Sequence, residues 1–158
     1  MLDPKTESAL DRMSELEKAV SRLYALYASR FPSHRGLWAA LSAEETEHAE
    51  WIRDLAGKVR DGHLQVSAGR FKTKTVETAL NSVEKHILDA ESGKPSALDS
   101  LSAAVALESS LLEKDFFRIH VEDSAEMKST LDRLAAATEN HRAKIQQAWR
   151  AARSEAGL

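Results

Sequence analysis

The sequence predicts an all-α fold, a four-helix bundle of two helical hairpins joined by a long crossover that contains a short fifth helix. Glycine and proline are scarce, with 6 and 3 residues in a chain of 158. Ala, Leu and Glu are abundant, which is typical of helical proteins. Apolar residues recur every three or four positions along four long segments of about 25 residues, or roughly 38 Å of helix each. The chain, residues 1–158, is long enough for a single domain with its own core.

The first predicted hairpin consists of helices at residues 4–30 and 34–61. Asp3 is a suitable N-cap, and a proline occupies the first helical position after it. Pro32 ends the first helix, because the residue before a proline disfavours helical geometry. Gly62 is a typical C-terminal stop for the second helix. Because the connection is short, the two helices are expected to be antiparallel neighbours.

The crossover and the second hairpin follow in the chain. A loop leads to the short amphipathic helix, predicted at residues 75–91. The third long helix is predicted at residues 96–121, and Ser96 begins it with the capping-box pattern S-x-x-D. The fourth is predicted at residues 124–153. A helix pair, a crossover and a second helix pair make a bundle with one long connection.

Glu45 and His48 mark the stretch around which the chain is organised. Three residues apart, they lie on one face of a helix. They fall within the apolar stripe of that helix, an arc of about 80° that includes Leu41 and Ile52. A charged group in such a stripe is costly unless something compensates it. The acidic residues off the stripe are predicted to form a solvated face: Glu44, Glu47, Glu50 and Asp54.

The two hairpins resemble copies of one unit. A shift of 91 residues superposes Glu17 on Glu108, and a shift of 93 superposes His48 on His141. Each of these four residues lies in an apolar stripe, and in an antiparallel hairpin the spacing brings each pair to a similar height. Five polar side chains are therefore expected to converge in the middle of the bundle: Glu17, Glu45, His48, Glu108 and His141.

At these residues the chain resembles the rubrerythrin-like branch of the ferritin-like superfamily. The segments that carry the resemblance are M-S-E-L-E-K-A-V-S-R-L-Y-A-L-Y-A, W-A-A-L-S-A-E-E-T-E-H-A-E-W-I and A-L-E-S-S-L-L-E-K-D-F-F. The resemblance spans about residues 5–153. It implies a site for two metal ions, usually iron. The first and third long helices would each contribute one Glu, and the second and fourth would each contribute an E-x-x-H motif. By position the implied ligands are Glu17, Glu45, His48, Glu108 and His141.

Thr138 departs from this pattern. It stands where the family has a bridging Glu, so the fourth helix carries T-E-N-H. Glu139 does not replace it, because it points about 200° away from His141 around the helix. Three carboxylates leave a charge of +1 with two divalent ions and −1 with one. The sequence leaves open a site for two ions, a site for one ion, and a lost site. Manganese or zinc remains an alternative to iron.

Three further residues near these positions carry polar groups: Tyr24, Glu113 and Asp115. Glu113 ranks second to Glu108 as the ligand from the third helix. Tyr24 lies two turns after Glu17 on the same face, where it is expected to be a core residue, with hydrogen bonding to a ligand or electron transfer as alternatives. Asp115 is expected to form an ion pair near the end of the bundle.

The function implied by the resemblance is redox chemistry at iron, either peroxidase or ferroxidase in type. Because the chain has no cysteine, it has no rubredoxin-type centre and would need a separate electron donor. A homodimer is expected, with a helix-swapped form as one option. The alternative is a non-catalytic helical module for interaction or dimerisation, with a vestigial metal site.

The overall charge and hydropathy exclude other classes. The formal net charge of −3 does not favour nucleic acid or an anionic membrane as a partner. No apolar run reaches the 18 or so residues needed to span a bilayer. The N-terminal residues lack the layout of a signal peptide. A cytoplasmic location is therefore expected.

Overall fold

A computed structural model describes residues 4–64, 66, 71–114 and 116–158, so Asp3 and Asp115 lie outside the described residues. The described residues are helical and contain no strand, which confirms the all-α prediction. The elements are α1 (Pro4–Arg30), the 3-10 turn η1 (Pro32–His34), α2 (Arg35–Arg60), α3 (Thr73–Ser92), α4 (Ala97–Glu113) and α5 (Ala125–Glu155).

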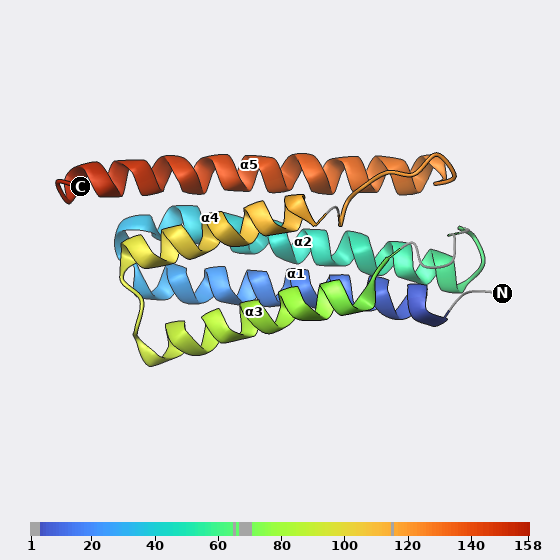
Figure 1. The fold of residues 1–158 in the computed structure, drawn as a ribbon, viewed down its shortest axis with the longest axis horizontal. Coiled ribbons are helices and arrows are strands. Elements are labelled where there is room, and N and C mark those ends of the chain that lie inside the picture. The colour runs from blue at the N-terminus through green and yellow to red at the C-terminus, as the bar shows by residue number, and fades with distance from the viewer. Residues whose placement is uncertain (1–3, 65, 67–70, 115) are drawn as a thin grey trace.

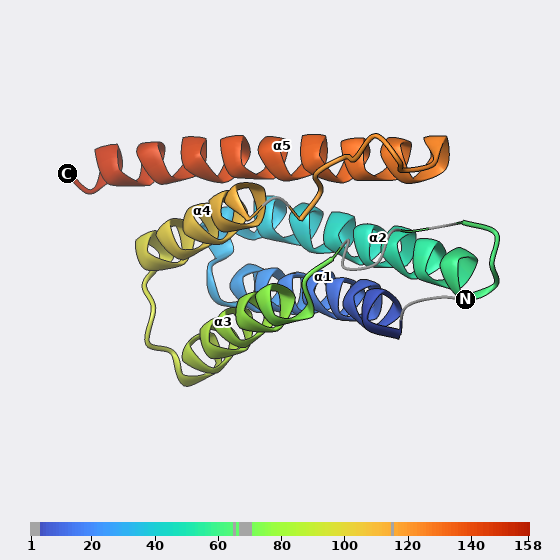
Figure 2. The ribbon, with the colours of Figure 1, turned by 45° about the vertical axis from the view of Figure 1, so that its right-hand side comes forward.

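The helices run back and forth along one long axis (Figures 1 and 2). Through η1, α1 and α2 form an antiparallel hairpin, and α3 returns beside α1. Helix α4 starts at the same end of the molecule as α2 and runs parallel to it. Helix α5 then runs antiparallel to α4. Contacts are extensive between α4 and α5 and narrower between α2 and α5. Helix α5 thus packs mainly on α4 and makes a smaller contact with α2.

The predicted short fifth helix is a full packing element in the structure. It spans Thr73–Ser92 and buries one face against α1. Its buried residues follow a helical period: Val76, Ala79, Val83, Ile87 and Ala90. Beyond α3 the chain turns at Gly93, whose φ of 79° lies in the left-handed region that suits glycine. The predicted capping box follows, with Asp99 N donating to Ser96 Oγ and Ser96 N donating to Asp99 Oδ2, both at 3.0 Å.

The predicted helix at residues 96–121 was too long, because α4 ends at Glu113. Phe116 and Phe117 are both buried, although neighbouring residues on a helix point about 100° apart. Further on, Asp123 Oδ2 accepts a hydrogen bond of 2.7 Å from His120 N, and Asp123 N donates to His120 O at 3.0 Å. Burial of two adjacent rings and this local turn outweigh the continuing helical pattern.

The core gathers on α1 and the helices that cover it. At the η1 end, Tyr24 and Tyr27 of α1 pack on Trp38 of α2, with ring centroids 5.2 and 4.9 Å apart. All three are fully buried, and each large buried apolar side chain contributes roughly 1.5–3 kcal/mol. Within the described part of the chain, no helix combines the length and the apolar character needed to cross a membrane. The aromatic cluster lies directly beside the polar cluster described next.

Candidate metal centre

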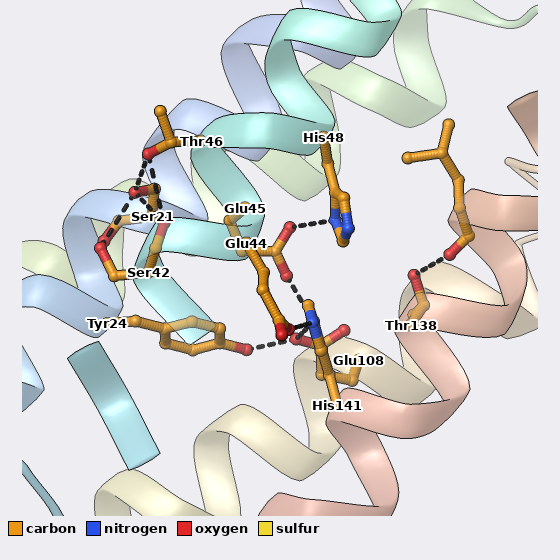
Figure 3. Close-up of polar contacts among 11 residues, drawn as sticks. Ser21, Tyr24, Ser42, Glu44, Glu45, Thr46, His48, Glu108, Thr138 and His141 are labelled. Carbon is orange, nitrogen blue, oxygen red and sulfur yellow. Dashed lines mark hydrogen bonds and ion pairs between the residues drawn. The ribbon is translucent and has the colours of Figure 1, made fainter. Parts of the chain in front are cut away.

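The middle of α2 places two polar side chains in the core. Glu45 and His48, one turn apart, are both buried. His48 Nδ1 donates to Glu45 Oε2 at 3.1 Å, so the pair shares one hydrogen bond (Figure 3). The E-x-x-H spacing puts both groups on one side of α2, as the sequence predicted.

His141 brings a second imidazole from α5. It is buried, and its Nδ1 lies 2.8 Å from Glu45 Oε1. Its ring stacks on that of His48, with centroids 5.3 Å apart. Each of Glu45, His48 and His141 offers a ligand atom within 4.8 Å of the other two. Atoms that bind one ion at about 2.0–2.2 Å lie within about 4.4 Å of each other, so a small contraction would let the three bind a common ion.

Two further carboxylates complete the buried cluster. Glu17 of α1 is 3% exposed and Glu108 of α4 is 0% exposed. Tyr24 donates its hydroxyl to Glu108 Oε1 at 2.5 Å, and that oxygen lies 3.7 Å from His141 Nδ1. Glu17 Oε2 and Glu108 Oε2 have no hydrogen-bond partner among the described residues. Buried carboxylate oxygens without a partner are costly, and a cation is the group that would satisfy them.

The electrostatics of the cluster divide the carboxyl groups. Burial, with the charge of Glu45, raises the pKa of Glu17 well above its usual range and raises that of Glu108. Burial would also raise the pKa of Glu45, but hydrogen bonds from His141 and His48 outweigh it and lower that pKa. Burial lowers the pKa of His141, but Glu108 and Glu45 outweigh it and raise the pKa to about 10. Protons on His141 and Glu17 therefore offset the negative charge, a role that a metal ion would take over.

Glu44, which was predicted to lie on a solvated face, is partly exposed but also contacts this cluster. Its Oε2 lies 2.5 Å from His141 Nε2, whereas Glu45 contacts the other ring nitrogen, Nδ1 (Figure 3). The side chain is 41% exposed, so it reaches the site from the rim. The sequence carried a signal for this position, because Glu44 precedes His48 by four residues and lies about 40° from it on a helix.

Thr138, Glu139, Glu113 and Tyr24 differ in their burial and contacts. Thr138 is buried, and its hydroxyl donates its proton to Leu134 O of its own helix at 2.8 Å, so it has no proton left to donate to the site carboxylates. Glu139 and Glu113 are exposed, so Glu108 is the carboxylate that α4 places in the core. Tyr24 is a core residue and also hydrogen-bonds a predicted ligand.

All five predicted site residues are buried, and they come from α1, α2, α4 and α5. Among the described residues, Glu45, His48 and His141 bring ligand atoms within 4.8 Å of one another, so they could hold one ion. Together the described residues define an all-helical protein with a candidate metal centre. Comparison with protein-family models, with curated proteins and with solved structures gives no match. The ferritin-like resemblance therefore stays a prediction that the site geometry must support.

Proposed function

We propose that the protein binds divalent transition-metal ions, iron in the first place, in a ferritin-like bundle formed by α1, α2, α4 and α5. The helix directions support this arrangement. The chain makes an antiparallel pair from α1 and α2, returns through α3, and makes a second antiparallel pair from α4 and α5. In this interpretation α3 is the long crossover in helical form.

The observation that carries the proposal is the meeting of Glu45, His48 and His141 in a buried place. Imidazole and carboxylate ligands suit iron, zinc and manganese, and the chain has no cysteine to favour softer ions. Without a cation, the cluster leaves one oxygen each of Glu17 and Glu108 buried without a partner in the part of the chain that the structure describes. A metal centre explains both features at once.

The first ion belongs to the three residues with matching geometry. Glu17 and Glu108, together with Glu45, are the residues that would hold a second ion. The three carboxylates balance three of the four positive charges of two divalent ions, and a hydroxide completes the balance. A single ion leaves one negative charge, which a proton on one of the carboxylates would neutralise.

Iron bound here would supply redox chemistry, either reduction of peroxide or oxidation of ferrous iron. The chain's own contributions are to hold the ion and to keep bulk water away from it, since Glu45, His48 and His141 are all buried. Tyr24 fixes one oxygen of Glu108, so the carboxylate presents its other oxygen in a constant direction. The separate electron donor and the homodimer stay predictions; mass measurement in solution tests the latter.

The experiment is metal counting on the whole chain. Protein freed of metal is loaded anaerobically with ferrous iron, and bound iron per chain is measured after gel filtration. The wild-type protein should retain one or two ions, and Glu45→Ala/His48→Ala should retain none. Glu47→Ala/His63→Ala removes the same two groups from exposed positions and should bind as the wild type does. Circular dichroism confirms that each variant is folded.

The two outcomes separate the functions considered. Retention of iron by Glu45→Ala/His48→Ala would contradict the ligand assignment. A wild-type protein that binds no iron, manganese or zinc, and whose Tm does not rise when they are added, would leave the helical interaction module as the better account.

A further inference from the structure

We propose that Glu44 is a positioning residue for His141: its carboxylate accepts a hydrogen bond from Nε2–H and so leaves Nδ1 unprotonated and directed toward the metal. The inference rests on the metal binding proposed above. It assigns a role to Glu44, whose place on α2 predicts a solvated side chain. It also explains how the site could function with Thr138 at the position where a fourth carboxylate is expected.

The two nitrogens of His141 face different surroundings. Nδ1 faces the inside of the cluster, 2.8 Å from Glu45 Oε1 and 3.7 Å from Glu108 Oε1. Nε2 faces outward, 2.5 Å from Glu44 Oε2. An ion bound to Nδ1 would take the place of the inner contact, while the outer contact with Glu44 would persist. The geometry thus gives each nitrogen its own task.

A neutral imidazole carries one proton, and its position decides which nitrogen can bind metal. A hydrogen bond from Nε2–H to a carboxylate keeps the proton on the outer nitrogen and leaves the lone pair of Nδ1 free. The same bond fixes the plane of the ring and makes Nδ1 a stronger donor. Glu44 is the carboxylate placed to do this for His141.

The hydrogen bonds described for the other polar groups near the ring do not involve Nε2. The Thr138 hydroxyl donates to Leu134 O, and Glu108 Oε1 accepts from Tyr24. Glu45 is shared between the two histidines. This leaves Glu44 as the acceptor that serves the outer nitrogen of His141 among the described residues.

Glu44 also contributes charge. The three buried carboxylates carry −3 when ionised, one short of two divalent ions. With Glu44 the total charge is −4. Glu44 contributes its charge without binding the ion, because it contacts the imidazole of His141. The side chain is 41% exposed, so its ionised form stays partly hydrated and costs less than a buried carboxylate would. A rim position can therefore offset part of the charge that is missing at Thr138.

The test uses zinc as the probe and three variants of the full chain. Glu44→Leu removes both the acceptor and the charge. Glu44→Gln keeps an oxygen acceptor and removes the charge. Glu47→Gln makes the same charge change at an exposed position of α2. Zinc affinity is measured by competition with a chromophoric chelator, together with the number of ions per chain. NMR of protein labelled with ¹⁵N-histidine reports which nitrogen of His141 carries the proton.

We expect zinc affinity to fall about 10–100-fold in Glu44→Leu, by less in Glu44→Gln, and not at all in Glu47→Gln, with unchanged stoichiometry. In zinc-loaded wild-type protein the His141 proton should reside on Nε2 in a hydrogen bond, and Glu44→Leu should lose that hydrogen-bonded signal. A simple ion pair would change stability while leaving zinc affinity and the proton position unaltered.

Unchanged affinity in Glu44→Leu, while the wild type binds zinc, overturns the role of Glu44 and leaves the metal centre standing. Loss of one ion per chain in Glu44→Leu would make Glu44 a direct ligand and overturn the positioning role. If the wild-type protein binds neither zinc nor iron nor manganese, both the metal centre and the role of Glu44 are overturned.

Discussion

The Tyr24 hydroxyl donates a hydrogen bond of 2.5 Å to Glu108 Oε1, across 84 residues of sequence. This contact joins α1 of the first hairpin to α4 of the second inside the core. It satisfies one oxygen of a buried carboxylate and leaves Oε2 without a partner among the described residues. A neutral phenol thus orients Glu108 without neutralising it, which is what a metal ligand requires of its neighbour.

Tyr24→Phe is expected to destabilise the metal-free protein by about 1–3 kcal/mol, because it leaves Glu108 Oε1 buried with one hydrogen bond fewer. The ring keeps its packing on Trp38. Urea unfolding measures the loss, and zinc competition should show weaker binding. Tyr27→Phe is the control, since that hydroxyl does not contact the site carboxylates. Equal zinc affinity in Tyr24→Phe and wild type would contradict the orienting role of Tyr24.

The two tyrosines of the chain should resist ionisation in the folded state. Burial raises the pKa of Tyr27 to about 12, and burial with the nearby Glu108 raises that of Tyr24 well above its usual value. Because the folded pKa exceeds the unfolded value of about 10, stability is fully present below pH 10. It is lost as pH rises from there toward 12.

Absorbance at 295 nm checks this directly. Folded protein at pH 10.5, a value set by the unfolded tyrosine pKa of about 10, should show almost no phenolate, whereas protein in denaturant should show both tyrosines ionising. A full phenolate signal at that pH, with circular dichroism still helical, would show that water reaches the rings and that the aromatic cluster is open.

Periodicity and local end signals predicted most of the fold. The helices, the capping box at Ser96 and the stop before Pro32 depend on residues close together in sequence. The end of α4 was missed because burial of Phe116 and Phe117 depends on distant parts of the chain. The packing of α3 along α1 could not be predicted from local pattern either. An amphipathic stripe predicts which face of a helix is buried, but not which other helix covers that face.

The site was predicted as far as helical faces allow. Glu45 and His48 follow from a spacing of three residues, and His141 follows from the repeat. Glu44 was missed because a helical wheel assigns a residue by where its Cα lies, whereas a Glu side chain at the edge of a face can reach across to another helix. The contact with His141, 97 residues away in the chain, appears only once α5 is in place.

Thr138→Glu should tighten metal binding. The position is buried and lies one turn before His141 on α5, so a Glu there would add a fourth carboxylate within the cluster. We expect higher zinc affinity and a stoichiometry nearer two, together with a metal-free protein destabilised by several kcal/mol from the extra buried charge. Thr138→Gln has the same size without the charge and serves as control. If Thr138→Glu bound zinc no better than Thr138→Gln, charge would not limit the site.

Trp51 offers an optical readout of the centre. Its ring centroid lies 5.0 Å from that of His48, and the Arg133 guanidinium lies over the Trp51 ring, 4.0 Å from its centroid. Binding of cobalt or iron at His48 would place a paramagnetic ion close to this indole, so Trp51 fluorescence should be quenched in proportion to the metal bound. Zinc, which has no unpaired electrons, should quench far less.

The chain has three tryptophans, so the signal must be assigned by substitution. Trp51→Phe should remove most of the metal-dependent quenching and keep metal stoichiometry unchanged. Trp149→Phe, on α5 beside Ser102, should keep the quenching. Quenching that survives in Trp51→Phe but disappears in Trp149→Phe would place the ion near Trp149, toward the C-terminal end of α5 and away from His48.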